Sequence, residues 1–427
     1  MINLRQYFKL SLLLVLFFFA CFGRVQAEEV LTWGNCIQEA AKNHPDLIAA
    51  QESIKQSEAI KKQTASGLFP QVTASLDAST AKTGGNLGKT SANAFSYGVG
   101  ATQLIFDGAK TINNVRAASE NILAAKQGFR FTSTSVRYKL RSSFIDLLQA
   151  QEMLRIAQEI YNIRRGNLEL ITLRYVSGLE NKGALLTAES DLAEATYGIS
   201  QARRGLVVGQ EELVKEMGRK ELTSMFVEGD FEVKDAALER PDFAALAKNN
   251  PSLQQLIYQK RSAEFSLKST YANFLPLLTG NTGVNRTGAN WAPRGDQMDL
   301  GLSLSLPLFE GGLRSAQVAQ AQALVKQLEE NQRSALDSAV LTLEQTWAAL
   351  QDALDNVNVQ KKVIIATQER STIAQAQYSI GFIAFDNWTI IEDNLVKAKR
   401  SYLNAQAAAL LAEAKWIQAK GETIEYE

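Results

Sequence analysis

The residues that could support catalysis or ligand binding are few and scattered. The segment Gly84-Gly85-Asn86-Leu87-Gly88-Lys89-Thr90 resembles part of a phosphate-binding loop, but Thr83 stands where that motif needs its first glycine. Such a loop must also lead into a helix, whereas the residues that follow here alternate as a strand does. We therefore interpret the segment as a surface turn.

Histidine and cysteine form no reactive or metal-binding set. His44 is the only histidine, and its place before Pro45 is typical of a residue on a helix surface. The only cysteines are Cys21 and Cys36, so the sequence lacks the Cys/His cluster that holds zinc and the partners of a catalytic triad. The many carboxylates fall on helix faces that we predict to be solvated. These observations predict a protein that is not an enzyme and uses no cofactor or metal.

The N-terminus has the layout of a secretory signal peptide. Basic residues precede an apolar run over residues 10–19, and the small-x-small site Val25-Gln26-Ala27 follows. The run is too short for a lasting membrane anchor. Lipid attachment at Cys21 is an alternative, although residues 18–20 fit a lipobox poorly. We expect cleavage after Ala27.

The mature chain is close to neutral and holds one cysteine. Cleavage removes three basic residues and no acidic one, which leaves a formal charge of −3 and no polycationic surface for nucleic acid. Cys36 alone remains, so no internal disulfide can form, and we interpret it as a small apolar helix residue. No later stretch is long and apolar enough to predict a transmembrane helix.

The mature sequence is duplicated. Three pairs of segments match, at offsets of 206, 203 and 203 residues: Ala41–Leu47 with Ala247–Leu253, Phe106-Asp107-Gly108 with Phe309-Glu310-Gly311, and Tyr175–Gly178 with Tyr378–Gly381. The offset changes once, so a loop of variable length should lie before the second pair. We predict a signal peptide (1–27), a first repeat (28–218), a linker near mid-height (219–235) and a second repeat (236–427).

A long helix is predicted in each repeat. Steps of four and three residues from Val136 to Tyr175 meet ten apolar residues in twelve, and the same steps from Ala339 to Tyr378 meet eight in twelve. This is the spacing of heptad-like helix packing. Helices over about 109–176 and 312–379 would each run for roughly 100 Å. Half-length helices are expected at about 34–66, 183–217, 242–272 and 384–420.

Each repeat also contains a predicted β-hairpin, over residues 71–105 and 277–308. Residues 71–80 and 298–306 alternate between polar and apolar side chains, with the apolar ones at even positions. Strands of about ten residues cross an outer membrane when tilted. Open sheet edges are not tolerated in lipid, and side chains fill an eight-stranded barrel. Three chains with twelve strands are therefore the smallest open pore that we expect.

The ordered set of these features resembles the TolC family of outer-membrane efflux proteins. The resemblance rests on Arg174–Leu179 and Gln377–Phe382, on the Phe-Asp-Gly and Phe-Glu-Gly turns after the hairpins, and on the duplication itself. It implies a homotrimer in the outer membrane, with a twelve-stranded β-barrel on a long periplasmic α-helical barrel. It also implies a passive exit duct for tripartite efflux or type I secretion, working with a periplasmic adaptor and an RND or ABC pump.

The residues of the periplasmic entrance depart from the family pattern. Family members often carry aspartates after the second glycine, where this chain has Asn387 and Ile390, and Asp386 lies one residue earlier. We predict an entrance or gate from the charged residues near the ends of the long helices, namely Glu180, Lys182, Asp386 and Glu392. The simpler alternative is helix-end charge without a special role.

Adaptor docking is expected at the turns between the long and the returning helices. The predicted docking residues are Tyr175, Gly178, Leu179, Tyr378, Gly381 and Phe382. Both glycines should cap the long helices. We expect the charged first tip to be more solvated, and the aromatic second tip to make the closing contacts.

A non-conducting coiled-coil structural protein of the cell envelope is the alternative function. Long helices with alanine-rich seams would serve it equally well. The membrane-length alternating hairpins, placed identically in both repeats, argue for the duct.

Overall fold

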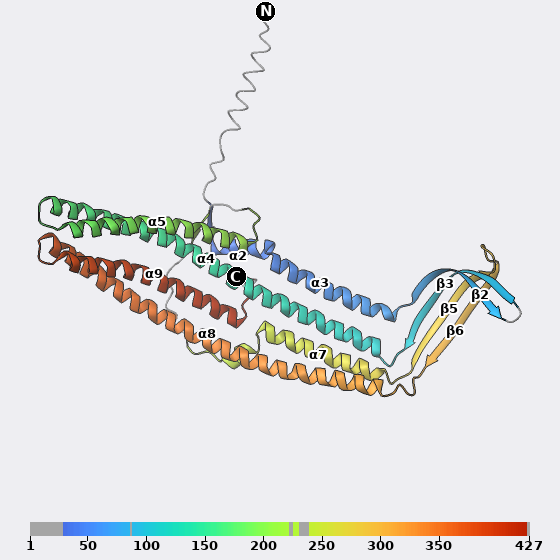
Figure 1. Cartoon of the computed structure of the whole chain (residues 1–427). Helices are drawn as coiled ribbons and strands as arrows, with labels where there is room; N and C mark the ends of the chain where they lie inside the picture. Colours follow the sequence, from blue (N-terminus) through green and yellow to red (C-terminus); the bar gives the residue numbers. More distant parts are fainter. Residues whose placement is uncertain (1–28, 86–87, 222–224, 230–238, 425–427) are drawn as a thin grey trace, which may run out of the picture.

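The computed structural model describes residues 29–85, 88–221, 225–229 and 239–424. The expected signal peptide and Cys21 lie outside them. The described chain is elongated, with long helices running side by side from helical hairpin tips at one end to a four-stranded sheet at the other (Figure 1). The fold is thus mainly helical with a sheet, as predicted.

Two helical hairpins of equal size form most of the length. Helices α4 (Lys110–Val176) and α8 (Leu313–Ser379) each contain 67 residues. The returning helices α5 (Lys182–Met217) and α9 (Phe385–Lys420) each contain 36. A helix of 67 residues is about 100 Å long. The equal lengths confirm that the constant spacing between the repeats reflects packed helices.

The seam predicted by steps of four and three residues is largely buried. In α4 the buried seam positions include Val136, Leu140, Ser143, Leu147, Ala157, Arg164 and Ile171. In α8 they include Leu343, Thr346, Leu350, Ser371, Ala374 and Tyr378. Side chains at these positions meet the facing helices because they share one helix face.

The half-length helices nearest the sheet differ from the prediction, because each is broken. Residues 34–66 form α2 (Trp33–Asn43) and α3 (Pro45–Ala65), and residues 242–272 form α6 (Phe243–Ala247) and α7 (Pro251–Ala272). Pro45 and Pro251 begin the second helix of each pair. Proline has no N–H for the preceding turn and disfavours helical backbone in the residue before it.

His44 is buried, which corrects the expectation of a surface residue. It caps α3, where its Nδ1 accepts a hydrogen bond from the Asp46 N–H at 3.2 Å, and its Nε2 lies 3.5 Å from Glu216 Oε2 on α5. Gly218 permits this junction, since a Cβ there would lie 2.5 Å from the Asn43 carbonyl oxygen. The break at Pro45 therefore turns His44 inward.

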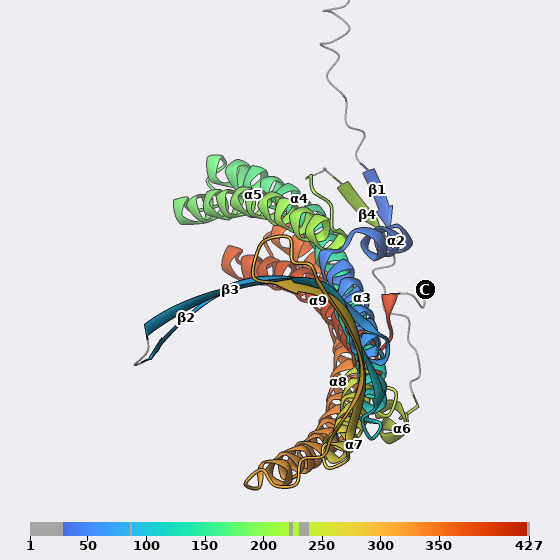
Figure 2. The ribbon, with the colours of Figure 1, turned by 90° about the vertical axis from the view of Figure 1, so that its right-hand side faces the viewer.

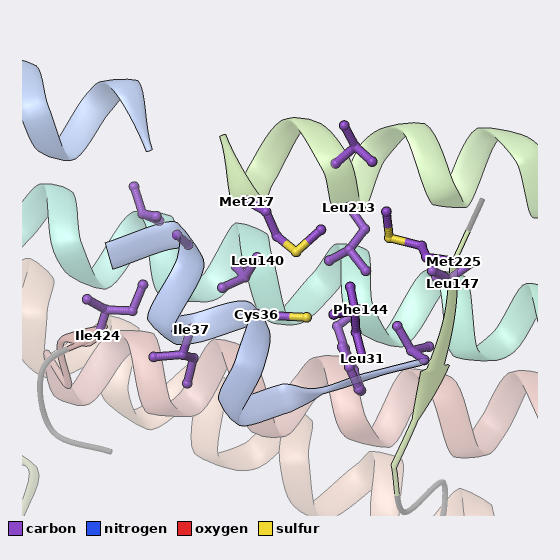
Figure 3. Packing of buried hydrophobic residues seen from close by; sticks show 14 of the residues in the cluster. Leu31, Cys36, Ile37, Leu140, Phe144, Leu147, Leu213, Met217, Met225 and Ile424 are labelled. Carbon is purple, nitrogen blue, oxygen red and sulfur yellow. The ribbon is translucent and has the colours of Figure 1, made fainter. Parts of the chain in front are cut away.

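A small core at mid-height joins the N-terminus to the first helical hairpin. Strand β1 (Glu29–Thr32) pairs in parallel with β4 (Met225–Glu228), which lies inside the predicted linker 219–235. Beneath them Cys36 packs among Leu140, Phe144, Leu213 and other apolar side chains (Figure 3). Cys36 is fully buried, and burial raises the pKa of its thiol to about 12. It is an apolar helix residue, as predicted.

Arg219 stabilises this core through ion pairs with two glutamates at its surface. The Arg219 guanidinium binds Glu29 at 2.7 Å and Glu39 at 2.6 Å. Its hydrogen bonds hold the pKa of the Glu29 carboxyl below its usual value. One side chain at the end of α5 therefore ties down both β1 and α2.

The four-stranded sheet unites the two predicted β-hairpins. Its order is β2 (Gln71–Gly85), β3 (Gly88–Phe106), β5 (Leu277–Gly288) and β6 (Gly295–Ser305), and all neighbours are antiparallel. The described residues of the phosphate-loop-like segment end β2 (84–85) and begin β3 (88–90), so the segment leads into a strand, as expected. Strands β2 and β6 are the free edges. Viewed from the end, the sheet and the helices curve around the same side (Figure 2).

No helix within the described ranges is both long and apolar enough to cross a membrane.

Candidate functional site: the hairpin tips and the amphipathic sheet

Both long helices end in the same glycine-based cap. Gly178 and Gly381 have φ values of +72° and +82°, which favour glycine. The next residue in each case donates its N–H to a carbonyl five residues back, Leu179 to Arg174 and Phe382 to Gln377, both at 2.8 Å. This is the Schellman arrangement. The capping glycines are therefore confirmed, and each turn sends the chain back into α5 or α9.

An aromatic cluster holds the second tip. The Tyr378 ring stacks on Trp388 with centroids 4.5 Å apart, and Phe385 packs against both rings. Tyr378 and Trp388 are each 1% exposed. Burial of such large rings excludes water and fixes the geometry of the turn. The second tip is thus well packed, as expected.

Tyr378 also connects the two tips. Its hydroxyl donates to Glu180 Oε2 of the first tip at 2.8 Å. The Arg174 guanidinium of α4 lies 4.7 Å from the ring centroid and donates to the Tyr378 carbonyl at 3.2 Å. Burial and the neighbouring Glu180 raise the pKa of the phenol above its usual value. The neutral hydroxyl therefore remains a donor and links one hairpin to the other.

The four charged residues predicted for the entrance do not form one group. Lys182 and Asp386 are exposed at the tips, and Asp386 lies in the first turn of α9. Glu180 is half-buried against Tyr378. Glu392 is buried between α8 and α9, where it accepts a hydrogen bond from the Ser371 hydroxyl at 2.5 Å. The structure thus corrects the assignment of Glu392 to an exposed entrance ring.

The predicted docking residues separate in the same way. Tyr175, Leu179 and Phe382 are exposed, and Phe382 is 75% exposed. Tyr378 is buried in the aromatic cluster, which corrects its assignment to a docking surface. Its position on the α8 seam explains the difference, since α9 folds back over that seam.

Ion pairs between the helical hairpins were missed from sequence. Arg164 of α4 is buried and contacts Asp191 of α5 at 3.4 Å and Asp393 of α9. Burial raises the pKa of Asp191, Arg164 opposes this, and Asp393 adds to it. Nearer mid-height, Lys399 of α9 binds Glu159 of α4. The sequence did contain a sign of these ion pairs, because Arg164 occupies a position in the heptad pattern where most residues are apolar.

The sheet at the opposite end has two chemically distinct faces. Residues paired across strands share a face. One face is mostly apolar and exposed: Val72, Ala74, Leu76, Ala78, Phe95, Tyr97, Val99, Ala101, Val284, Met298, Leu300, Leu302 and Leu304. The other is mostly polar or glycine: Gln71, Thr73, Ser75, Asp77, Ser79, Ser96, Gly98, Gly100, Thr102, Asn281, Gly283, Asn285, Thr287, Gln297, Asp299, Gly301, Ser303 and Ser305.

The apolar face has the chemistry of a lipid-contacting surface. Met298, Leu300, Leu302 and Leu304 are 68–85% exposed, far more than isolated apolar side chains need to be. An antiparallel sheet with one such face, on helices of about 100 Å, defines a subunit of an outer-membrane channel with a long helical extension.

Comparison with known proteins gives the same class. The model of the family "Outer membrane efflux protein" matches residues 36–219 and 244–422. BepC of Brucella suis is 21% identical over 94% of this chain and 84% of its own length, and TolC of Escherichia coli is 23% identical over 91% and 80%. The CusC structure superposes with a TM-score of 0.81 at 18% identity, covering 90% of this chain and 91% of CusC. The open MtrE channel of Neisseria gonorrhoeae gives 0.77 at 16%, over 91% and 88%.

The chain belongs to the outer membrane efflux protein family. This family is made of channel proteins, and its members are exit channels of efflux systems in the outer membrane of Gram-negative bacteria. The protein is therefore an outer-membrane efflux channel.

Proposed function

We propose that three copies of the chain assemble into an exit duct with a continuous wall. The four-stranded sheets form a twelve-stranded barrel in the outer membrane, and the helices form a tunnel across the periplasm. The duct receives cargo from a periplasmic adaptor and an inner-membrane pump of the RND or ABC type, in tripartite efflux or type I secretion. It catalyses no reaction and uses no cofactor.

The main support for this proposal is the unpaired backbone edge of β2 and of β6 in the sheet. Strands β2 and β6 have one paired neighbour each within the chain, and their exposed apolar face requires lipid. Lipid does not tolerate unpaired backbone donors and acceptors. Pairing β6 of one copy with β2 of the next satisfies both edges, and the common curvature of sheet and helices favours closure (Figure 2).

The tips are proposed to dock the adaptor and to close the duct. Leu173, Val176, Leu179, Ile380 and Phe382 are 67–79% exposed there, which is costly unless a partner covers them. Asp386 is exposed beside them and is repeated three times in the trimer. Like-charge repulsion among the three carboxylates would hold the closed entrance near its opening threshold.

The test is mass and conductance of the purified protein. Detergent-extracted protein should have the mass of a trimer and should form pores in planar lipid bilayers. A stable monomer or dimer would refute the assembly. A trimer that never conducts would instead support the non-conducting structural protein.

A further inference from the structure

The polar face of the sheet carries charge of one sign, which is negative. Its only ionisable side chains over strand residues 71–84, 91–104, 277–287 and 295–305 are Asp77 and Asp299. The two basic residues within these ranges, Lys82 and Arg286, register on the opposite face. Arg286 is also neutralised there by Asp296, 2.5 Å away. Over these strand residues the polar face is therefore acidic and holds no compensating cation.

Glycines leave room for these polar side chains to lie against the sheet. Gly283 is directly opposite Asp299, and a Cβ at Gly283 would lie 2.8 Å from Asp299 Oδ1. Likewise a Cβ at Gly98 would lie 1.8 Å from Asn285 Oδ1. The carboxylate of Asp299 thus lies over Gly283 on the neighbouring strand.

The two carboxylates stand at different levels of the sheet. The Asp299 row continues through Gly283 and Gly100 to Thr73 on β2. Asp77 is four residues further along β2, which is about 13 Å at the usual strand rise. Both carboxylates are exposed, and the Ser96 hydroxyl lies 3.5 Å from Asp77 Oδ2. A solute that follows this face passes two acidic levels.

We propose that Asp77 and Asp299 set the charge preference of the outer-membrane section of the duct, which favours cationic and neutral solutes over anionic ones. The inference rests on the proposed trimeric barrel, in which this face lines the lumen and each level is repeated three times. Fixed charges of one sign along a narrow passage with low-dielectric walls concentrate counter-ions and exclude co-ions. The preference resides in the barrel, about 100 Å from Asp386 at the tips.

The experiment measures reversal potentials of the reconstituted full-length protein under a potassium chloride gradient. Wild type should prefer potassium over chloride at about 0.1 M salt, where the Debye length is about 10 Å, and less so at about 1 M, where it is about 3 Å. The double variant Asp77→Asn/Asp299→Asn should lower the permeability ratio by at least about twofold. The single variant Asp299→Lys should lower it further.

Asp296→Asn is the matched control. Asp296 lies on the same strand as Asp299 but registers on the opposite face, so its replacement should leave the permeability ratio unchanged. Trimer yield in detergent shows that each variant has assembled.

The outcomes separate this inference from the proposed duct. A wild type that forms no pore refutes the duct and this inference together. A wild-type pore whose preference is unchanged in the double variant, or changes only with Asp386→Ala, overturns this inference and leaves the duct intact. An equal effect of Asp296→Asn would show that the lumen faces the other side.

Discussion

Replacing Arg164 by leucine tests whether inter-hairpin ion pairs hold the tips together. Arg164 joins its own helical hairpin through Asp191 and the other through Asp393. Arg164→Leu keeps a side chain of helical propensity on the seam but leaves two neighbouring carboxylates without their cation. The variant should loosen the packing of the two hairpins near the entrance and bias the duct toward opening.

The magnitude follows from burial. The side chains of Arg164, Asp191 and Asp393 are 9%, 25% and 45% exposed. Breaking a fully buried pair costs about 3–5 kcal/mol, and an exposed pair about 0–1 kcal/mol. Because these side chains are only partly buried, loss of the Arg164 ion pairs should cost about 1–3 kcal/mol of packing free energy per protomer. For three copies the cost is roughly 3–9 kcal/mol if the contributions add.

The pH dependence has a defined sign. Burial and Asp393 already raise the pKa of Asp191, while Arg164 lowers it. Without Arg164 that pKa rises further, and protonation then removes the repulsion between the two acids. The effect of Arg164→Leu should therefore be larger at about pH 8 than at about pH 5, since protonation increases as pH falls.

The assay is single-channel conductance, supported by the sensitivity of cells to a large hydrophilic antibiotic. Arg164→Leu should raise the open fraction and the antibiotic sensitivity. Arg165→Leu is the matched control, because Arg165 binds Glu169 on its own helix at 3.2 Å and both side chains are mostly exposed. Equal behaviour of the two variants, or a closed Arg164→Leu duct at both pH values, would refute the reasoning.

Three further predictions concern the membrane, the gate and the partner. Leu302→Arg on the apolar face should impair trimer assembly by about 2–4 kcal/mol if residue 302 lies near the bilayer midplane. Ser303→Arg on the polar face should be tolerated better. Equal trimer yields of the two variants on semi-native gels would disprove that the apolar face contacts lipid. Asp386→Ala should change conductance or cation block of the reconstituted pore more than Glu180→Ala, because Asp386 is exposed and Glu180 is bonded to a tyrosine; unaltered conductance and export in Asp386→Ala would remove it from the gate. Phe382→Asp should abolish adaptor capture in a pull-down, since it places a charge on an exposed apolar side chain of the proposed docking surface; retained capture would place docking elsewhere.

Sequence reasoning succeeded where a periodic pattern specified the structure. The seam from Val136 to Tyr175 predicted α4 within one or two residues, because one buried face every three to four residues is a strong constraint. Gly178 and Gly381 marked helix ends because few other residues adopt a positive φ. Alternation over 298–306 identified the apolar face of β6, since side chains along a strand alternate strictly.

Local reasoning failed where a proline interrupts a helix between apolar residues. Residues 34–66 were predicted as one helix, although Pro45 and Pro251 stand at matching places in the two repeats. Their effect on the preceding residue could have been read from sequence. The burial of His44 that follows from this break could not be read from the sequence, because it depends on Gly218 and Glu216, which approach His44 only in the folded chain.

The sequence by itself therefore determined the duplication, the long helices, the hairpins and the apolar face of β6, because each rests on spacing along the chain. Only the tertiary structure decided which side chains meet across hairpins. Tyr378 and Glu180 are 198 residues apart in sequence, and Arg164 and Asp393 are 229 apart. Their pairing depends on how α4 and α9 are rotated and aligned, and no residue spacing within one helix records that. For the same reason the sequence predicted surface positions for Glu392 of α9 and Tyr378 of α8, which the packing of α8 against α9 buries.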